Sequence, residues 1–310
     1  MNKFYSNGKL LLTGEYVVLD GAMALALPTT YGQSLNVESI NEPKVVWQSF
    51  DKNGNIWFES EFIIHHDEII NQVKTGSAES EQLLQILNAV KQINPLFFNY
   101  EKGFHISTKL DFPKNWGLGS SSTLINNIAK WTKVDAYKLL KLTFGGSGYD
   151  IACAQHNQPI TYQVKNDKRI IKGINFNPKF SDYLYFVYLN KKQNSREGIA
   201  YYRDNVSTTK EAISEISDIT LKIIDCTSLN EFESLINRHE QIIASLTKQE
   251  TVKDVLFKNF KGSIKSLGAW GGDFVLITSR ENPSNYFKSK GFDIIIPYEN
   301  IILNHKKKPY

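Results

Sequence analysis

A glycine- and serine-rich run in the middle of the chain, Gly117-Leu118-Gly119-Ser120-Ser121-Ser122, has the composition of a phosphate site. Apolar residues recur after them at helical spacing, which predicts that the loop opens a helix. A helix N-terminus leaves backbone N–H groups unpaired and carries partial positive charge, so it favours an anion. Glycine lets the backbone approach closely, and serine hydroxyls donate to phosphate oxygens or bind Mg²⁺. A flexible turn followed by an N-cap has the same composition.

The loop does not fit two common nucleotide-binding motifs. The Walker pattern requires a lysine before its Ser or Thr, and no lysine lies between Gly117 and Ser122. The dinucleotide-binding pattern requires a third glycine where this chain has Ser122. Neither of these two motifs therefore describes the loop.

Two further glycine clusters each lead to a carboxylate. Gly145-Gly146-Ser147-Gly148 stands before Tyr149 and Asp150. Gly268-Ala269-Trp270-Gly271-Gly272-Asp273 precedes Phe274–Thr278, an apolar run typical of a strand. The chain thus offers three small-residue loops for binding and chemistry.

The elements that must position these loops are β-rich at the start and helical later. The helix patterns cover Ala78–Ile93, Thr209–Cys226 and Leu229–Leu246. The expected strands are Leu10–Leu12, Tyr16–Leu19, Ser34–Ser39, Val45–Ser49, Ile56–Phe58 and Phe104–Leu110. The length of 310 residues suits two domains, which we place at residues 1–180 and 181–310 because the pattern of expected strands and helices changes between them.

Composition excludes several classes of function. No apolar run approaches the roughly 20 residues of a membrane span, and the polar start Met1–Lys9 lacks the layout of a secretory signal. Two cysteines are too few for a disulfide framework, so we expect a cytoplasmic protein. Its expected assembly is a monomer or a homodimer. The net charge is +4, and the one dense basic run, Lys306–Lys308, is interpreted as a solvated tail, not as a nucleic-acid contact.

Three separated segments together resemble the motifs of the GHMP kinases, in the same order. They are Gly8–Leu19, with the sequence GKLLLTGEYVVL, then Pro113–Ser122, and finally Gly268–Asp273. The resemblance implies an α+β fold of two domains: an N-terminal S5-like α/β domain and a C-terminal ferredoxin-like domain. It also implies a small-molecule kinase that uses ATP and Mg²⁺.

Details of these motifs look most like phosphomevalonate kinases, with mevalonate kinases as the nearest rival. The details are Gly14-Glu15-Tyr16, Gly148–Cys153 beside the pattern G-x-D-I-A-C, and Gly271-Gly272-Asp273. The implied reaction is phosphorylation of an isoprenoid-pathway metabolite, phosphomevalonate first and mevalonate second. A catalytically inactive relative that binds a nucleotide or metabolite is the alternative from another class.

The resemblance also implies residue roles. Asp150 matches the carboxylate that accepts the substrate hydroxyl proton, although an N-cap role is open. Lys9 matches the lysine that lowers the pKa of this carboxylate or stabilises developing charge, although a strand-edge lysine is open. Ser121 matches a Mg²⁺ ligand. The implied ATP-phosphate residues are Gly117, Leu118, Gly119, Ser120, Ser121 and Ser122.

Substrate contacts are implied on the remaining loops. Glu15 either contacts the substrate, orients Lys9 or a turn, or is an exposed strand glutamate. The segment Lys191–Arg196 is either a cationic loop that binds substrate or a solvated hairpin. The implied substrate residues are Glu15, Ser147, Gly148, Lys192, Ser195, Arg196 and Trp270.

The chain departs from the family pattern in two places. Trp270 stands where the third motif usually has glycine, so its indole must narrow the substrate pocket or stack on something. No glutamate lies between Ser122 and Gly145 to match the second Mg²⁺ ligand of the mevalonate kinase branch. Ser121, water and phosphate would then hold the metal.

Overall fold

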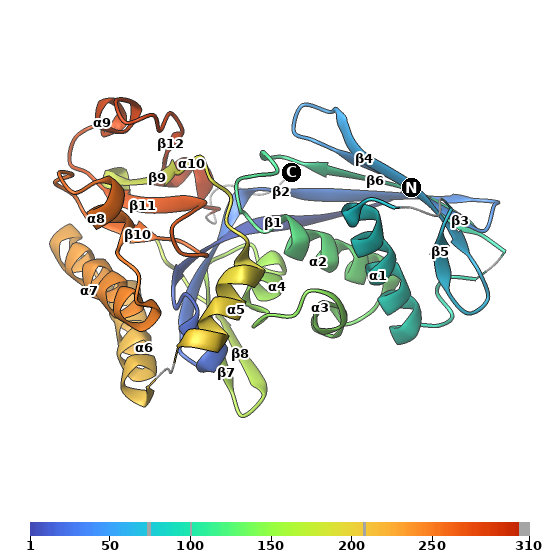
Figure 1. Cartoon of the computed structure of the whole chain (residues 1–310), viewed down its shortest axis with the longest axis horizontal. Coiled ribbons are helices and arrows are strands. Elements are labelled where there is room, and N and C mark those ends of the chain that lie inside the picture. The colour runs from blue at the N-terminus through green and yellow to red at the C-terminus, as the bar shows by residue number, and fades with distance from the viewer. Residues whose placement is uncertain (73–75, 100, 207–208, 304–310) are drawn as a thin grey trace. The chain divides into compact units, whose positions relative to one another are not determined.

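The computed structural model describes residues 1–72, 76–99, 101–206 and 209–303, which form a mixed α+β protein (Figure 1). The basic run at 306–308 lies outside these residues. The chain divides into two compact units. Unit 1 comprises Met1–Gly8, Tyr31–Lys114 and Gly119–Gln155; unit 2 comprises Lys9–Thr30, Asn115–Leu118 and the chain from His156 onward. The domain boundary expected near residue 180 stays a prediction.

Unit 1 contains a mixed sheet with the strand order β5-β4-β3-β6-β2. Strands β3 and β6 are parallel, and the other pairs are antiparallel. The bounds are β2 Ala24–Ile40, β3 Lys44–Phe50, β4 Ile56–Ile64, β5 Ile69–Asn71 and β6 Gly103–Leu110. They confirm the strands expected at Ser34–Ser39, Val45–Ser49, Ile56–Phe58 and Phe104–Leu110.

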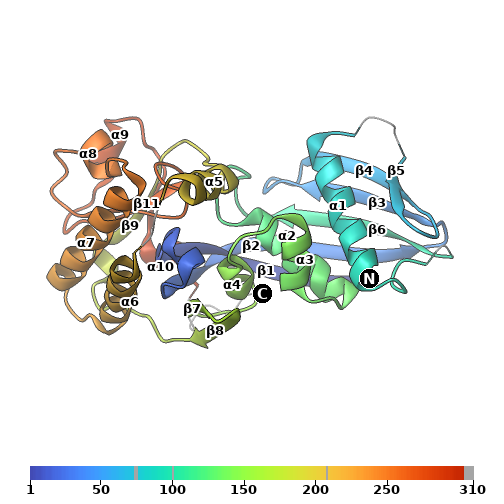
Figure 2. The same cartoon turned by 60° about the horizontal axis from the view of Figure 1, so that its bottom comes forward.

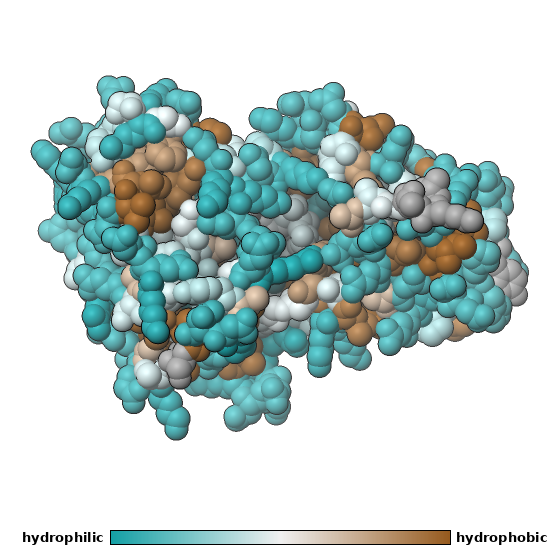
Figure 3. Space-filling view, viewed as in Figure 1, coloured by the Kyte–Doolittle hydropathy of each residue, from teal (hydrophilic) through white to brown (hydrophobic). Residues whose placement is uncertain are grey.

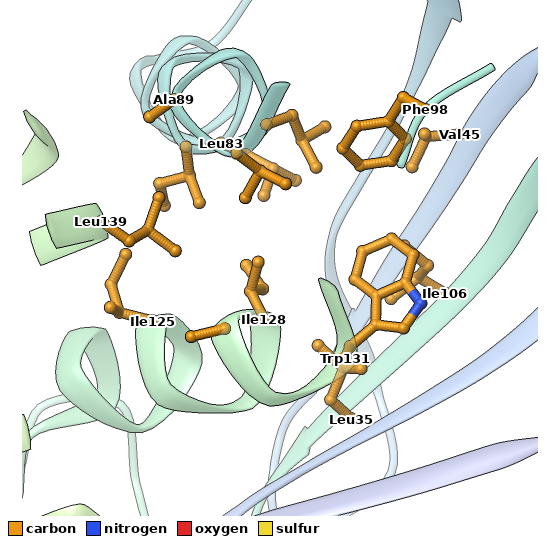
Figure 4. Packing of buried hydrophobic residues seen from close by; sticks show 14 of the residues in the cluster. Leu35, Val45, Leu83, Ala89, Phe98, Ile106, Ile125, Ile128, Trp131 and Leu139 are labelled. Atoms are coloured by element: carbon orange, nitrogen blue, oxygen red, sulfur yellow. The ribbon is translucent and has the colours of Figure 1, made fainter. Parts of the chain in front are cut away.

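The described residues of unit 1 form four helices beside this sheet, and α1, α2 and α3 lie on one of its faces (Figure 2). They are α1 Ala78–Ile93, α2 Ser120–Thr132, α3 Ala136–Thr143 and α4 Tyr149–Ala154. Figure 4 shows Leu83 of α1, Ile128 and Trp131 of α2 and Ile106 of β6 in one buried cluster. This core fixes α2, and with it the loop that precedes α2.

Strands β1 (Asn2–Thr13) and β2 run from one unit into the other. In unit 2, Ala24–Ala26 of β2 pair with β7 (Ile160–Lys165), which pairs with β8 (Lys168–Gly173). The strand expected at Leu10–Leu12 is confirmed within β1.

The strand expected at Tyr16–Leu19 is wrong, because these residues form a tight turn. A short 3-10 helix covers Val17–Asp20, and Tyr16 has φ 61°. Gly14 (φ 89°) and Gly21 (φ 96°) supply the left-handed conformations on either side. Val17 and Val18 are both buried in the turn, so the run does not alternate across a sheet.

Unit 2 also contains a four-stranded antiparallel sheet, with the order β10-β11-β9-β12. Its strands are β9 Leu184–Tyr188, β10 Ile264–Ser266, β11 Phe274–Thr278 and β12 Ile295–Pro297. The α-helices in the described part of unit 2 are α5 Ser195–Asn205, α6 Lys210–Asp225, α7 Leu229–Thr247, α8 Val252–Leu256, α9 Ser284–Lys288 and α10 Tyr298–Ile301. A 3-10 turn covers Ser181–Tyr183. The expected helices at Thr209–Cys226 and Leu229–Leu246 and the strand Phe274–Thr278 are confirmed.

Polar side chains surround smaller apolar areas on the face drawn in Figure 3. Within the described ranges, no helix combines the length and the apolar character that crossing a bilayer requires.

Candidate phosphate and substrate site

The glycine and serine loop opens helix α2, as predicted. Gly119 occupies the N-cap position with φ 87°, and no side chain caps this helix end through a hydrogen bond within the described chain. The N–H of Thr123 donates to the Gly119 carbonyl at 3.0 Å. The N–H groups of the preceding helix residues have no acceptor inside the helix, which is the arrangement that binds anions.

The three serines of the loop differ in what their hydroxyls do. Ser122 is buried, and its hydroxyl donates to the Gly119 carbonyl at 2.8 Å. Ser121 is exposed and Ser120 half-buried. A phosphate contact of Ser122 would therefore come from its N–H group, while Ser121 presents its hydroxyl to solvent, where a cation or phosphate could meet it.

Lys9, from the first motif, is bonded to the loop within unit 2. Its backbone N–H donates to the Leu118 carbonyl at 2.9 Å, and its ammonium donates to the Gly117 carbonyl at 3.3 Å. The first two motifs are therefore in direct contact.

Asp273, from the third motif, meets the same loop. Gly117 has φ 64°, and a Cβ on it would lie 2.2 Å from both Cγ and Oδ2 of Asp273. The carboxylate Oδ1 accepts the N–H of Gln193 at 3.1 Å. Burial raises the pKa of Asp273, while the N–H of Gln193 and the charges of Lys9 and Lys192 oppose that rise. All three motifs thus converge in unit 2 on a carboxylate flanked by two lysines.

The segment Lys191–Arg196 leads from β9 into helix α5, so the hairpin alternative is wrong. The Lys191 carbonyl accepts the N–H of Asp273 at 2.8 Å. Asn194 caps α5 by accepting the N–H of Arg196 at 3.1 Å. Ser195 and Arg196 lie exposed in the first turn of α5, and their substrate contacts stay a prediction.

Asp150 lies in the first turn of α4 in unit 1, half-buried. Gly148, with φ 88°, holds the N-cap position, so the N-cap alternative for Asp150 is wrong. Ser147 accepts the N–H of Tyr149 at 3.5 Å, and Asn126 of α2 donates to the Ala154 carbonyl at 3.2 Å. Helix α4 is thus tied to the helix that carries the phosphate loop. Asp150 and Lys9 belong to different units, and their pairing stays a prediction.

Glu15 is fully buried, so the alternative of an exposed strand glutamate is wrong. Its Oε1 lies 2.8 Å from the ammonium of Lys265, and its Oε2 lies 3.3 Å from Nε2 of His239. Its side chain is enclosed within unit 2, and its expected contact with substrate stays a prediction.

Trp270 is also buried, at 8% exposure. Its indole N–H donates to the Glu250 carbonyl at 3.0 Å, and its backbone N–H donates to the Tyr16 hydroxyl at 2.9 Å. Gln193 donates to the Trp270 carbonyl at 3.2 Å. The indole therefore anchors the third motif within unit 2, and its contact with substrate stays a prediction.

Sequence reasoning left several residues without a role. Asp273 stood within a recognised motif, but its partner Gln193 gave no signal. His239 and Glu240 occupy positions on the apolar face of α7, between Ile236 and Ile243, where charged residues are unusual. Charged residues at these apolar-face positions were the one feature of the sequence that could have indicated a buried polar cluster.

No protein-family model matches the chain, and no curated relative matches it. Solved structures do. The mevalonate kinase of Methanococcus jannaschii superposes with a TM-score of 0.69 at 16% identity, covering 98% of each chain. A Streptococcus pneumoniae phosphomevalonate kinase, in complex with phosphomevalonate and AMPPNP, gives 0.66 at 12% identity, covering 98% of this chain and 99% of that one. Lactococcus lactis galactokinase, complexed with galactose, gives 0.66 at 14%, covering 93% and 88%.

The chain therefore has the fold of the GHMP kinases, as the three motifs predicted. The three solved structures named above are a mevalonate kinase, a phosphomevalonate kinase and a galactokinase. Identities of 12–16% establish the fold and not the activity.

Proposed function

We propose that this chain is an ATP- and Mg²⁺-dependent kinase that phosphorylates a hydroxyl group of a small isoprenoid-pathway metabolite. The observation that carries the proposal is the meeting of Lys9, Gly117 and Asp273, one from each of three separated motifs. Packing alone does not require two lysines and a carboxylate around a glycine loop, whereas phosphoryl transfer requires positioned charges.

The residues present fit the phosphates of ATP and one Mg²⁺ ion. The uncapped N-terminus of α2 offers backbone N–H donors, and the positive φ of Gly119 leaves the loop backbone accessible. The exposed hydroxyl of Ser121 would supply one oxygen to Mg²⁺, with phosphate and water supplying the others. Bound Mg²⁺ would neutralise charge on the phosphates.

Two residues of the chain carry the proposed chemistry. Asp150 accepts the proton of the substrate hydroxyl. The hydroxyl oxygen then forms a bond to the γ-phosphorus of ATP, and the bond between the γ-phosphorus and ADP breaks. Lys9 supplies positive charge beside the phosphate loop, which its ammonium contacts through the Gly117 carbonyl.

We place phosphomevalonate first among acceptors and mevalonate second. Lys192, Ser195 and Arg196 lie together along the chain at the entry to α5, and Lys192 is near enough to influence the pKa of Asp273. Two cations and a hydroxyl suit an acceptor that already carries a phosphate or carboxylate.

An acceptor screen tests the proposal. Purified protein with ATP and Mg²⁺ is offered phosphomevalonate, mevalonate, galactose and other sugar alcohols, and ADP release is followed together with mass spectrometry of the product. We expect one phosphorylated product, from phosphomevalonate.

The missing glutamate between Ser122 and Gly145 favours a second candidate, an inactive protein that binds nucleotide or metabolite. Measurable ATP binding without turnover of any acceptor would select this candidate and reject the kinase.

A further inference from the structure

Four buried titratable residues form a cluster in unit 2. The ammonium of Lys265 lies 2.8 Å from Oε1 of Glu15 and 3.1 Å from Oε1 of Glu240. His239 faces the same carboxylate of Glu15 at 3.3 Å. All four side chains are enclosed, with the largest exposure, 4%, at Glu240. The members come from the first motif, helix α7 and strand β10.

The electrostatics keep this cluster together. Burial lowers the pKa of Lys265, but the charges of Glu15 and Glu240 outweigh burial and leave it raised. Burial raises the pKa of Glu15 to about 7 despite Lys265, and it raises the pKa of Glu240 as well. An ammonium that serves two buried carboxylates cannot be removed alone without leaving uncompensated charge.

His239 holds the turn beside Glu15 as a neutral ring. Its Nε2 accepts the N–H of Gly14 at 3.0 Å. Burial, with the charge of Lys265 as a smaller cause, depresses the pKa of His239 well below its usual value. The backbone at Gly14 and the side chain at Glu15 are therefore both fixed to elements from the far end of the sequence.

The cluster connects the first motif with the strand that precedes the third motif. Lys9 of the first motif and Asp273 of the third lie at the proposed site. Lys9 and Glu15 bracket the end of β1, and Lys265 stands in β10 just before the loop that ends at Asp273. Ser266 adds a bond from its hydroxyl to Oε2 of Glu240 at 3.0 Å. The first and third motifs are thus connected at two places. Glu15 contacts Lys265 at one of them. At the other, Asp273 lies against Gly117, whose carbonyl accepts a hydrogen bond from Lys9.

We propose that Lys265 is a positioning residue of the proposed kinase, which holds the first motif against the third and so sets the place of Lys9 beside the phosphate loop. The inference rests on the proposed function. Lys265 touches neither ATP nor substrate, and it acts through Glu15 and the backbone that leads to Lys9.

The test uses a variant that removes every charge of the cluster at once. Lys265→Met alone would strand two buried carboxylates and unfold the protein, so the informative variant is Lys265→Met with Glu15→Gln and Glu240→Gln. Neutral side chains of similar volume in place of a buried ion network are compatible with folding. The matched control, Glu215→Gln with Arg238→Met, removes an exposed ion pair of 2.6 Å between α6 and α7.

We expect the triple variant to stay folded by circular dichroism and to lose about 10–100-fold in kcat, since small displacements of positioned groups cost about that much. Its dissociation constant for ATP should change little, and the pH profile of kcat should shift because Lys9 has moved relative to its neighbours. The control variant should match the wild type in all three. A triple variant with wild-type kcat and pH profile would overturn the proposal.

A second readout is independent of turnover. The rate at which acetic anhydride modifies Lys9, followed by peptide mass spectrometry, reports the surroundings of its amine. We expect this rate to change severalfold in the triple variant and not in the control. If the wild type phosphorylates no acceptor while the Lys9 rate responds as expected, the kinase proposal fails and the positioning contact stands. An unchanged Lys9 rate overturns the positioning contact itself.

Discussion

The carboxylate of Asp273 lies directly against the Cα of Gly117. A Cβ at Gly117 would stand 2.2 Å from two atoms of that carboxylate, and φ at Gly117 is 64°. Glycine is thus required there twice, by backbone conformation and by a side chain from the opposite end of the sequence. This contact is what brings the third motif to the phosphate loop.

Gly117→Ala should therefore damage activity more than its backbone strain explains. A left-handed alanine costs about 1–2 kcal/mol wherever it occurs, whereas at Gly117 the Asp273 carboxylate must also move. We expect kcat/KM to fall at least tenfold, given that displacements of about 1 Å cost about 10²-fold. Gly54→Ala is the control, because Gly54 has φ 88° with nothing within 4 Å of its Cβ position. Equal losses of activity in the two variants would contradict the assigned contact.

Lys9 and Asp273 should be energetically coupled. The charge of Lys9 opposes the burial that raises the pKa of Asp273, so each residue should matter less once the other is neutral. A double-mutant cycle with Lys9→Met and Asp273→Asn, read in kcat/KM, should give about 0.5–3 kcal/mol of coupling. Lys3→Met, at an exposed position of the same strand, should be additive with Asp273→Asn. Additivity in both cycles would show that the lysine and carboxylate act separately.

Asp150→Asn should remove nearly all turnover while ATP still binds. The amide keeps the shape of the side chain but cannot accept the substrate proton, so we expect a loss of about 10²–10⁴-fold in kcat. Asp135→Asn is the matched control, since Asp135 caps α3 through the N–H groups of Tyr137 and Lys138, a task that asparagine also performs. A near-normal rate for the Asp150 variant, with calorimetry showing normal ATP affinity, would remove Asp150 from its role.

Glu15 should make stability fall as pH rises through the neutral range. Burial raises its pKa in the folded protein to about 7, from 4.5, so the folded state binds the extra proton between these values. Its stabilising contribution is full below about pH 4.5 and is lost as pH rises through about 7.

Urea unfolding between pH 5 and 8 measures this effect. We expect Glu15→Gln to flatten the decline, with a smaller slope left by Glu240, whose pKa burial also raises. Glu59→Gln, at an exposed strand position, should keep the wild-type slope. An unchanged slope in the Glu15 variant would mean that this carboxyl is not the group that titrates.

Trp270→Phe should weaken the fold more than it weakens substrate binding. The indole N–H donates to the Glu250 carbonyl, and losing such a bond costs about 0.5–1.5 kcal/mol. We expect the melting temperature to fall while KM for the acceptor stays near the wild-type value. Trp57→Phe, at a partly exposed position, is the control for the substitution itself. A large rise in KM would instead place the indole at the substrate.

The parts of the fold with strong local signals were predictable from the sequence. Helix α1 has the predicted bounds Ala78–Ile93, because its apolar spacing is regular and Ser77 caps its start. Helix α5 escaped prediction because Tyr202 is its only buried residue, so its sequence carries almost no periodic signal. Apolar content alone gave a wrong strand prediction at Tyr16–Leu19, where Gly14 and Gly21 allow the chain to turn.

The site was predictable as a set of motifs but not as a set of contacts. Glycine and serine at a helix start predicted helix α2 and the loop before it, because that signal is local. The burial of Glu15 depends on Lys265, which lies 250 residues away, and no local pattern encodes that partner. The contact of Asp273 with Gly117 likewise follows from tertiary structure alone.

The two units interleave along the sequence, and this has a consequence for synthesis on the ribosome. Lys9–Thr30 belong to the same unit as the chain from His156 onward, and the path passes between units five times. The buried carboxylate of Glu15 emerges from the ribosome long before its counterion Lys265, so it must stay hydrated until nearly the whole chain has been translated. Neither unit can be expressed from one uninterrupted gene fragment. A nascent chain that stops before residue 265 lacks the ammonium that neutralises the carboxylate of Glu15.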